Sequence, residues 1–166
     1  MRLGIVALVA VILAAGGVTL ASADSGKRAG DGRSEVIKLF ALTDLDQSAD
    51  LDLGATGESV GDRFVFSDDL YTRKGGDKVG IDGGECIVVR LDTAARSATV
   101  QCAVTASLDD RGQITVQGLV TFSESEAGAT FTLPITGGSG DFRGASGEIT
   151  VEELSDTESN LTLSLD

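Results

Sequence analysis

An acidic side chain interrupts an apolar row in the segment that spans residues 63–71. Phe64, Phe66 and Leu70 share one face of this segment by their alternating spacing. Asp68 falls on the same face, and an acid in an apolar row is more informative than an acid on a polar surface. Burial would favour its neutral form and raise its pKa, so Asp68 is a candidate proton donor to a bound molecule. The alternative is that this aspartate and the one after it lie at the strand end and face water.

Two further charged residues occur in the largely apolar segment 79–91. Arg90 shares the parity of Cys86, and so would face the same side of a strand. Glu85 is the other charged candidate in this segment. We therefore include Glu85 and Arg90 with Asp68 as candidate polar anchors for a ligand. Whether Arg90 points inward or reaches water at the strand end stays open.

The chain contains two cysteines, Cys86 and Cys102, on segments that a turn joins at residues 92–97. If the two cysteines pair across this hairpin, the turn centres on Ala94, which suits the residues there. A cross-strand disulfide is the favoured interpretation for a secreted chain. The alternative is a pocket thiol at Cys86, although the chain has no histidine to activate it.

Several kinds of chemistry are disfavoured by residue type or spacing. The absence of histidine from the sequence excludes Ser-His-Asp and Cys-His catalysis and histidine-ligated metals within this chain. The glycine-rich stretch 136–147 lacks the Gly-Lys-Ser/Thr ending of a phosphate loop and is followed by a strand pattern. The aspartates of the polar stretch 43–59 do not have the spacing of an EF-hand. We therefore expect no metal site and no organic cofactor.

The periodicity of the whole chain predicts strands and no helix in the mature protein. Alternating segments with short connections are typical of an all-β fold, and we expect an eight-stranded antiparallel up-and-down β-barrel. Such a barrel encloses side chains or one small ligand. Because some strands are apolar on both faces, one apolar set should line the interior and the other should be covered by a partner subunit. The predicted strands are 36–42, 63–71, 79–91, 98–106, 112–122, 130–135, 147–154 and 160–165.

Two sequence blocks resemble the allene oxide cyclase and dirigent-protein superfamily. Residues 114–118 read Ile-Thr-Val-Gln-Gly, and residues 135–147 read Ile-Thr-Gly-Gly-Ser-Gly-Asp-Phe-Arg-Gly-Ala-Ser-Gly. The glycine-punctuated block is the most specific mark. A second block is similar to the cyclases in order and type, and it comprises Gly61-Asp62, Phe66, Leu70-Tyr71, Val79-Gly80-Ile81 and Gly84-Glu85-Cys86.

The resemblance implies a barrel with an apolar cavity, and a homotrimer as a possible assembly. It places Asp68 where the cyclases carry a pocket asparagine. The cyclases also carry a glutamate and an asparagine on the first strand, which fall at or near Ala41 and Thr43 here, so allene oxide cyclisation itself is not expected. The candidate ligand-binding set is Phe66, Asp68, Tyr71, Glu85 and Arg90, with Asp68 as the best catalytic candidate.

Two functions remain open at this point. The first is a protein that holds a small apolar molecule and steers its cyclisation or coupling, as plant dirigents and bacterial cyclases of this barrel do. The second is a non-catalytic barrel that binds an apolar metabolite or has a structural role. A barrel interior filled by the phenylalanines would rule out a ligand and leave only a structural role.

The N-terminal residues have the features of a secretory signal. Arg2 precedes the apolar run 3–15, and a small-residue cleavage site occupies 21–23. We predict a signal peptide at 1–23, a flexible linker at 24–33 and one barrel domain at 34–166. The protein should be secreted, with no membrane association after cleavage. The net charge of −13 argues against nucleic acid as a partner.

Overall fold

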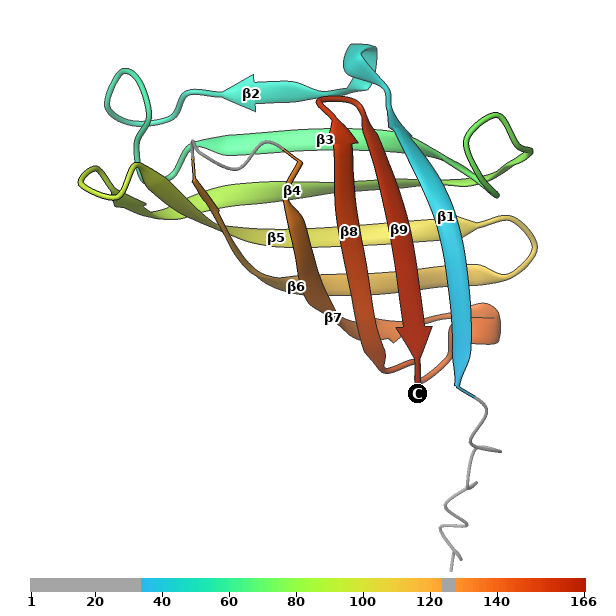
Figure 1. The fold of residues 1–166 in the computed structure, drawn as a ribbon. Helices are drawn as coiled ribbons and strands as arrows, with labels where there is room; N and C mark the ends of the chain where they lie inside the picture. The colour runs from blue at the N-terminus through green and yellow to red at the C-terminus, as the bar shows by residue number, and fades with distance from the viewer. Residues whose placement is uncertain (1–33, 124–127) are drawn as a thin grey trace, which may run out of the picture. The chain divides into compact units, whose positions relative to one another are not determined.

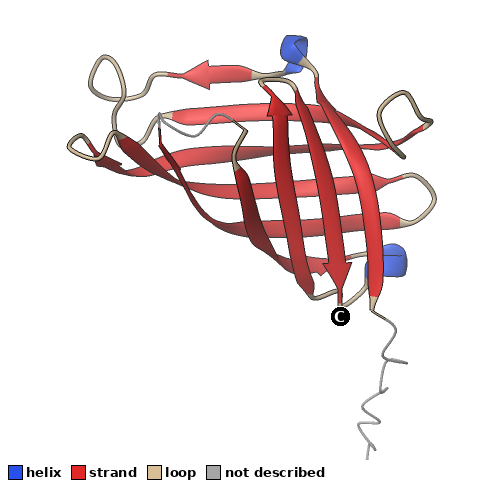
Figure 2. Ribbon diagram, in the orientation of Figure 1, coloured by secondary structure: helices blue, strands red, loops and turns tan. Residues whose placement is uncertain are grey.

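The chain folds almost entirely into β-strands (Figures 1 and 2). The computed structural model describes residues 34–123 and 128–166, so the predicted signal peptide and linker lie outside the described residues. Two single turns of 3-10 helix interrupt the strands. The elements are β1 (Glu35–Thr43), η1 (Leu45–Gln47), β2 (Ala49–Leu51), β3 (Arg63–Tyr71), β4 (Lys78–Asp92), β5 (Ser97–Leu108), β6 (Gly112–Ser123), β7 (Thr130–Gly138), η2 (Gly140–Phe142), β8 (Gly147–Ser155) and β9 (Glu158–Leu165).

Eight of the strands form a closed antiparallel ring. Each strand from β3 to β9 pairs with the next one, and β1 closes the ring by pairing with β9 on one side and β3 on the other. The predicted eight-stranded antiparallel up-and-down barrel is therefore confirmed. The short strand β2 was not predicted. It pairs with residues Arg63–Val65 of β3, beyond the residues of β3 that β1 reaches.

One end of the barrel is filled by its own side chains. Alternation along the strands sends apolar residues inward from several strands at once. Leu70 of β3, Ile114 of β6 and Leu163 of β9 are almost completely buried there. These residues belong to the packed core that fills this end of the barrel.

The glycine-rich connection between β7 and β8 covers the closed end. Its single turn η2 buries Phe142, and the guanidinium of Arg111 stacks 4.6 Å from the centre of that ring. A Cβ at Gly138 would lie 2.5 Å from the carbonyl oxygen of Phe142. Gly147 has a φ of +128°, and a Cβ there would lie 2.0 Å from the carbonyl oxygen of Ser164. The glycines therefore permit close backbone packing, which agrees with the tight connection expected from the sequence.

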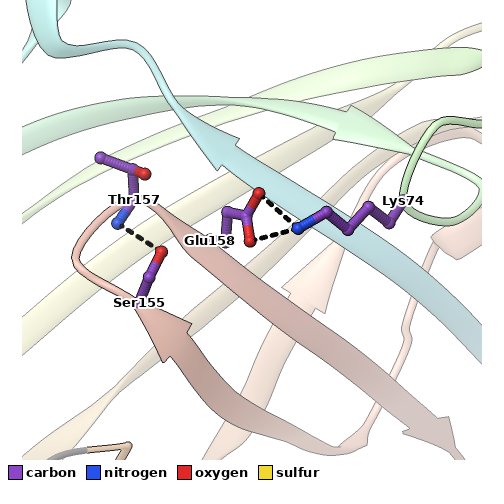
Figure 3. A network of polar contacts seen from close by, with 4 residues as sticks. All are labelled: Lys74, Ser155, Thr157 and Glu158. Atoms are coloured by element: carbon purple, nitrogen blue, oxygen red, sulfur yellow. Dashed lines mark hydrogen bonds and ion pairs between the residues drawn. The ribbon is translucent and has the colours of Figure 1, made fainter.

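The seam between β1 and β3 is short. It aligns only Phe40–Thr43 with Asp68–Tyr71, whereas the β1–β9 pairing runs along nearly the whole of β1. The loop after β3 reinforces this seam from outside. Lys74 reaches across β1 and binds both carboxylate oxygens of Glu158 at 2.7 and 2.6 Å, as Figure 3 shows. On the way its ammonium lies 5.7 Å from the ring centre of Phe40, within the range of a cation–π contact.

The first and last residues of the barrel strands both lie at the closed end of the barrel. Glu35, the first residue of β1, is the register partner of Leu165, the last residue of β9. In Figure 1 the C-terminus is drawn near η2, away from the β4–β5 hairpin. Within residues 34–123 and 128–166, no helix is long and apolar enough to cross a membrane.

Candidate functional site

The other half of the barrel encloses a cavity of about 690 Å³. Its floor lies against the packed core, and its rim includes β2 and the loop that joins β2 to β3. This volume is in the usual range for sites that bind small organic molecules. Most of the lining is apolar: Leu51, Phe64, Phe66, Val88, Leu91, Ala98, Val100, Val104, Val116, Phe122, Phe131, Leu133, Ile149, Val151 and Leu161.

Two pairs of phenylalanines line opposite walls of this cavity. Phe64 and Phe66 of β3 stack with their ring centres 5.4 Å apart. Phe122 of β6 and Phe131 of β7 meet edge to face at 5.6 Å. Strand β7 is four places from β3 in a ring of eight strands, so the two pairs face each other across the barrel. The phenylalanines therefore do not fill the interior; they provide two aromatic walls with space between them.

Two aspartates lie side by side at the floor of the cavity. Asp68 of β3 and Asp82 of β4 are register partners on adjacent strands, and both line the cavity. Asp82 is only 6% exposed. One carboxyl oxygen of each aspartate is buried and has no hydrogen-bond partner among the described residues. The Thr43 hydroxyl, at the end of β1, lies beside the Asp68 carboxyl.

Burial shifts the proton affinity of both aspartates in the same direction. It raises the pKa of Asp82 from near 3.8 to about 8, and the negative charge of Asp68 adds to this shift. Burial also raises the pKa of Asp68, while hydrogen bonds from Thr43 and Asp82 act in the opposite direction. Because its pKa is about 8, Asp82 keeps its proton at neutral pH. A carboxylic acid that keeps its proton near neutral pH can act as a general acid.

A third carboxyl group lines the wall nearer the rim. Glu153 of β8 is half-buried, and burial raises its pKa. A register irregularity between Glu153 and Ser155 lies at this point of the β8–β9 pairing. Neither Glu153 nor Asp82 was predicted from the sequence. Both share the parity of inward residues on their strands, with Val151 before Glu153 and Cys86 after Asp82, so alternation carried a signal for each.

The predicted disulfide is present in the cavity wall. Cys86 of β4 and Cys102 of β5 are register partners, and their sulfur atoms are bonded. Both residues line the cavity. Because the sulfurs are bonded to each other, the alternative of a reactive thiol at Cys86 is not supported. The disulfide instead ties two neighbouring strands of the wall together.

The rim of the cavity is acidic, and hydrogen bonds fix the loop that forms it. Asp50, Asp52, Glu58 and Asp62 line it, all from β2 and the loop after it. The Asp62 carboxylate accepts hydrogen bonds from backbone N–H groups within this loop at 2.9 and 2.7 Å, and these bonds lower its pKa. The loop is also joined to β4 through backbone hydrogen bonds with Val88. Asp62 thus holds the shape of the rim.

The structure separates the sequence-predicted ligand residues into two groups. Phe66 and Asp68 line the cavity, whereas Tyr71, Glu85 and Arg90 do not. Tyr71 lies toward the closed end and donates a hydrogen bond to Asp69 at 3.3 Å. Phe66 and Asp68 therefore lie where a ligand in the cavity would contact them and Tyr71 does not, while a ligand role for any of them stays a prediction.

The two charged candidates on β4 face outward. Glu85 forms an ion pair with Arg63 at 2.9 Å, and its side chain is 41% exposed. By strand alternation it faces away from Cys86, which is inside. Arg90 is exposed because a bulge between Val88 and Arg90 shifts the alternation by one residue, so that the next residue enters the cavity instead. Neither Glu85 nor Arg90 therefore lies where it could anchor a ligand inside the cavity, and of the two positions left open for Arg90 the structure has the exposed one.

Comparison with known proteins agrees with this geometry. The sequence model of the family described as "allene oxide cyclase barrel like domain" matches residues 42–163. A solved structure of pyocyanin demethylase is 32% identical, with a TM-score of 0.68 over 80% of this chain and 100% of that one. AbnU, an exo-specific intermolecular Diels-Alderase, is 18% identical, with a TM-score of 0.64 over 81% of this chain and 98% of that one. The pterocarpan synthase dirigent protein PsPTS1 is 13% identical, with a TM-score of 0.59 over 81% and 94%. At these lower identities the last two show a shared fold alone.

Proposed function

Because the chain belongs to the allene oxide cyclase barrel-like family, we propose that it binds a small, largely apolar molecule in its barrel and promotes a rearrangement of that molecule by proton transfer. The reaction class is a cyclisation, coupling or related rearrangement of a conjugated compound. Asp82 would be the proton donor, and Asp68 would hold the matching negative charge. The first-strand positions Ala41 and Thr43 lack the acid of the cyclases, and here a carboxyl comes from β4 instead.

The observation that carries this proposal is a pair of facing aspartates at the floor of an apolar cavity. A general acid works best when its pKa lies near the working pH, and burial raises the pKa of Asp82 to about 8. The aromatic walls would hold a flat molecule in one orientation above the pair. Orientation of this kind can lower a barrier by several kcal/mol, up to roughly 7–11 kcal/mol in the best cases.

A second candidate function is action on pyocyanin or a similar flat compound. It is favoured by the 32% identity to pyocyanin demethylase, which extends over the whole of that chain. The cavity of about 690 Å³ and its two aromatic walls suit a flat ring system. The two candidates share one binding site and differ in which bond changes after binding.

We expect the protein to work outside the cytoplasm and as an oligomer. The disulfide between Cys86 and Cys102 supports an oxidising compartment, in agreement with the predicted signal peptide. Large apolar side chains, among them Ile81 and Leu119, are exposed by 49% and 62%. A homotrimer, the assembly suggested by the family resemblance, would cover such residues. Light scattering of the purified protein gives the assembly directly, and a monomer would contradict this expectation.

The test combines capture of the natural ligand with an activity measurement. Native mass spectrometry of protein purified from its own host should reveal a retained small molecule. That molecule, and pyocyanin separately, would be incubated with wild-type protein and with Asp82→Asn, and the products followed by mass and absorbance. We expect turnover by the wild type and at least a hundredfold loss in the variant, within the usual range for a general acid. Binding without turnover would favour the non-catalytic alternative, and no binding of either compound would refute the proposal.

A further inference from the structure

The charged groups around the cavity are nearly all of one sign. At the rim Asp50, Asp52 and Glu58 carry carboxylates. The lining also includes the cation Arg63, which is paired with an outward-facing acid at 2.9 Å. Acidic loops on their own are common in a protein of net charge −13, so the rim alone would not identify a ligand.

The floor of the cavity provides an independent observation. Only 6% of Asp82 is exposed, and one of its carboxyl oxygens has no hydrogen-bond partner among the described residues. The same is true of one oxygen of Asp68 beside it. Glu153 adds another half-buried carboxyl to the wall. A buried carboxyl oxygen without a partner costs free energy, so a bound group that carries positive charge or donates a hydrogen bond would be stabilised beside it.

The aromatic walls favour the same kind of partner. Phe64 and Phe66 stack on one side, and Phe122 and Phe131 meet on the other. The face of an aromatic ring attracts a cation that is removed from water, and the ring also packs well against flat apolar groups. A cavity with apolar aromatic walls and an acidic floor therefore complements a flat molecule that carries positive charge.

We propose that the ligand of this cavity is a flat organic cation, with its ring system between the two phenylalanine pairs and its positive charge directed at Asp68 and Asp82. This inference rests on the proposed function and specifies the class of ligand. The rim carboxylates attract the cation and repel anions. The bound cation then supplies the positive charge that faces the two floor carboxyls.

The experiment compares three fluorescent probes with the same tricyclic ring and different charge. The probes are 10-methylacridinium (cation), 10-methylacridone (neutral) and acridine-9-carboxylate (anion), titrated against the purified wild-type protein at neutral pH. The cation should bind at least about tenfold more tightly than the neutral compound, and the anion more weakly than both. Equal affinities for the cation and the neutral probe would overturn the cation preference. Failure of all three to bind would overturn cavity binding itself.

A matched pair of variants separates the cavity from the general charge of the protein. Asp68→Asn with Asp82→Asn neutralises the floor, and the preference for the cation should fall to within about threefold. Glu148→Gln with Glu152→Gln removes two carboxylates from the exposed outer face of β8 and should keep the full preference. An equal loss in both double variants would show that net charge attracts the cation, and would overturn the proposal.

A salt series on the wild type gives a measurement that does not depend on any variant folding. Buried charges are screened much less than exposed ones. Between about 0.05 and 0.5 M salt, the ratio of the cation and neutral affinities should change by less than about threefold. A ratio that falls to unity would place the attraction on the exposed surface and would overturn the proposal.

Discussion

Replacing Asp82 by asparagine should stabilise the protein at neutral pH. Folding transfers the Asp82 carboxyl from water, where its pKa is near 3.8, to a site where its pKa is about 8. Between these two values the folded state binds more protons than the unfolded state, so the free energy of unfolding falls as pH rises. This loss of stability is absent when the pH is below the pKa of Asp82 in the unfolded state. It grows as the pH rises and reaches its full size above the pKa of Asp82 in the folded state. Asparagine has nearly the same shape and carries no such penalty.

The magnitude follows from the size of the shift. Each pH unit above the unfolded pKa costs about 1.4 kcal/mol, and at pH 7 the carboxyl is about three units above it, which gives an upper value of about 4 kcal/mol. We expect the variant to be more stable than the wild type by roughly 2–4 kcal/mol at pH 7 and by nearly zero at about pH 4. This would be an example of stability given up at a functional site.

The assay is urea unfolding of both proteins at several pH values between about 4 and 8.5, with the disulfide intact. The difference between the two proteins cancels the carboxyl groups that they share, apart from Asp68, whose pKa depends on Asp82. Glu148→Gln on the outer face of β8 is the control, and its difference from the wild type should stay within about 0.5 kcal/mol at every pH. A difference for Asp82→Asn that does not change with pH, or a destabilisation at pH 7, would refute the reasoning.

Three further predictions concern the frame of the barrel. Replacing Cys86 and Cys102 together by alanine should lower the free energy of unfolding by about 2–4 kcal/mol, because they join residues 16 positions apart; an unchanged urea midpoint would contradict this. A double-mutant cycle with Lys74→Met and Glu158→Gln should give a coupling energy of about 0.3–1 kcal/mol, and zero coupling would mean that the ion pair does not support the seam. Gly147→Ala should cost more than about 2 kcal/mol in thermal unfolding, because of its φ of +128° and the carbonyl oxygen 2.0 Å from the added Cβ; a melting temperature equal to that of the wild type would show that the backbone adjusts freely.

The barrel was predictable because its strands alternate strongly. The row Phe64, Phe66 and Leu70 defined β3 with its observed ends, Arg63 and Tyr71. The short strand β2 was missed because all three of its residues are exposed and no apolar row marks them. Its pairing with β3 comes from the tertiary arrangement, which local periodicity does not contain.

The candidate site was predictable only in part. The inward position of Asp68 followed from its apolar neighbours, while its role in binding or catalysis stays a prediction. Asp82 was overlooked because the glycines around it leave few side chains to mark the alternation, although its parity with Cys86 did carry a signal. Counting residues from Cys86 left the orientation of Arg90 open, and the bulge between Val88 and Arg90, which local periodicity does not show, turns it outward.

Because the first and last barrel residues, Glu35 and Leu165, are paired, the C-terminal end of the barrel is a suitable attachment point. A tag or a second protein attached after Asp166 would leave from the pole opposite the rim, so immobilisation through that end would keep the opening exposed to the medium. For the same reason, a short linker could join residues 34 and 166 and allow new termini at a turn such as 93–96, whose residues are exposed.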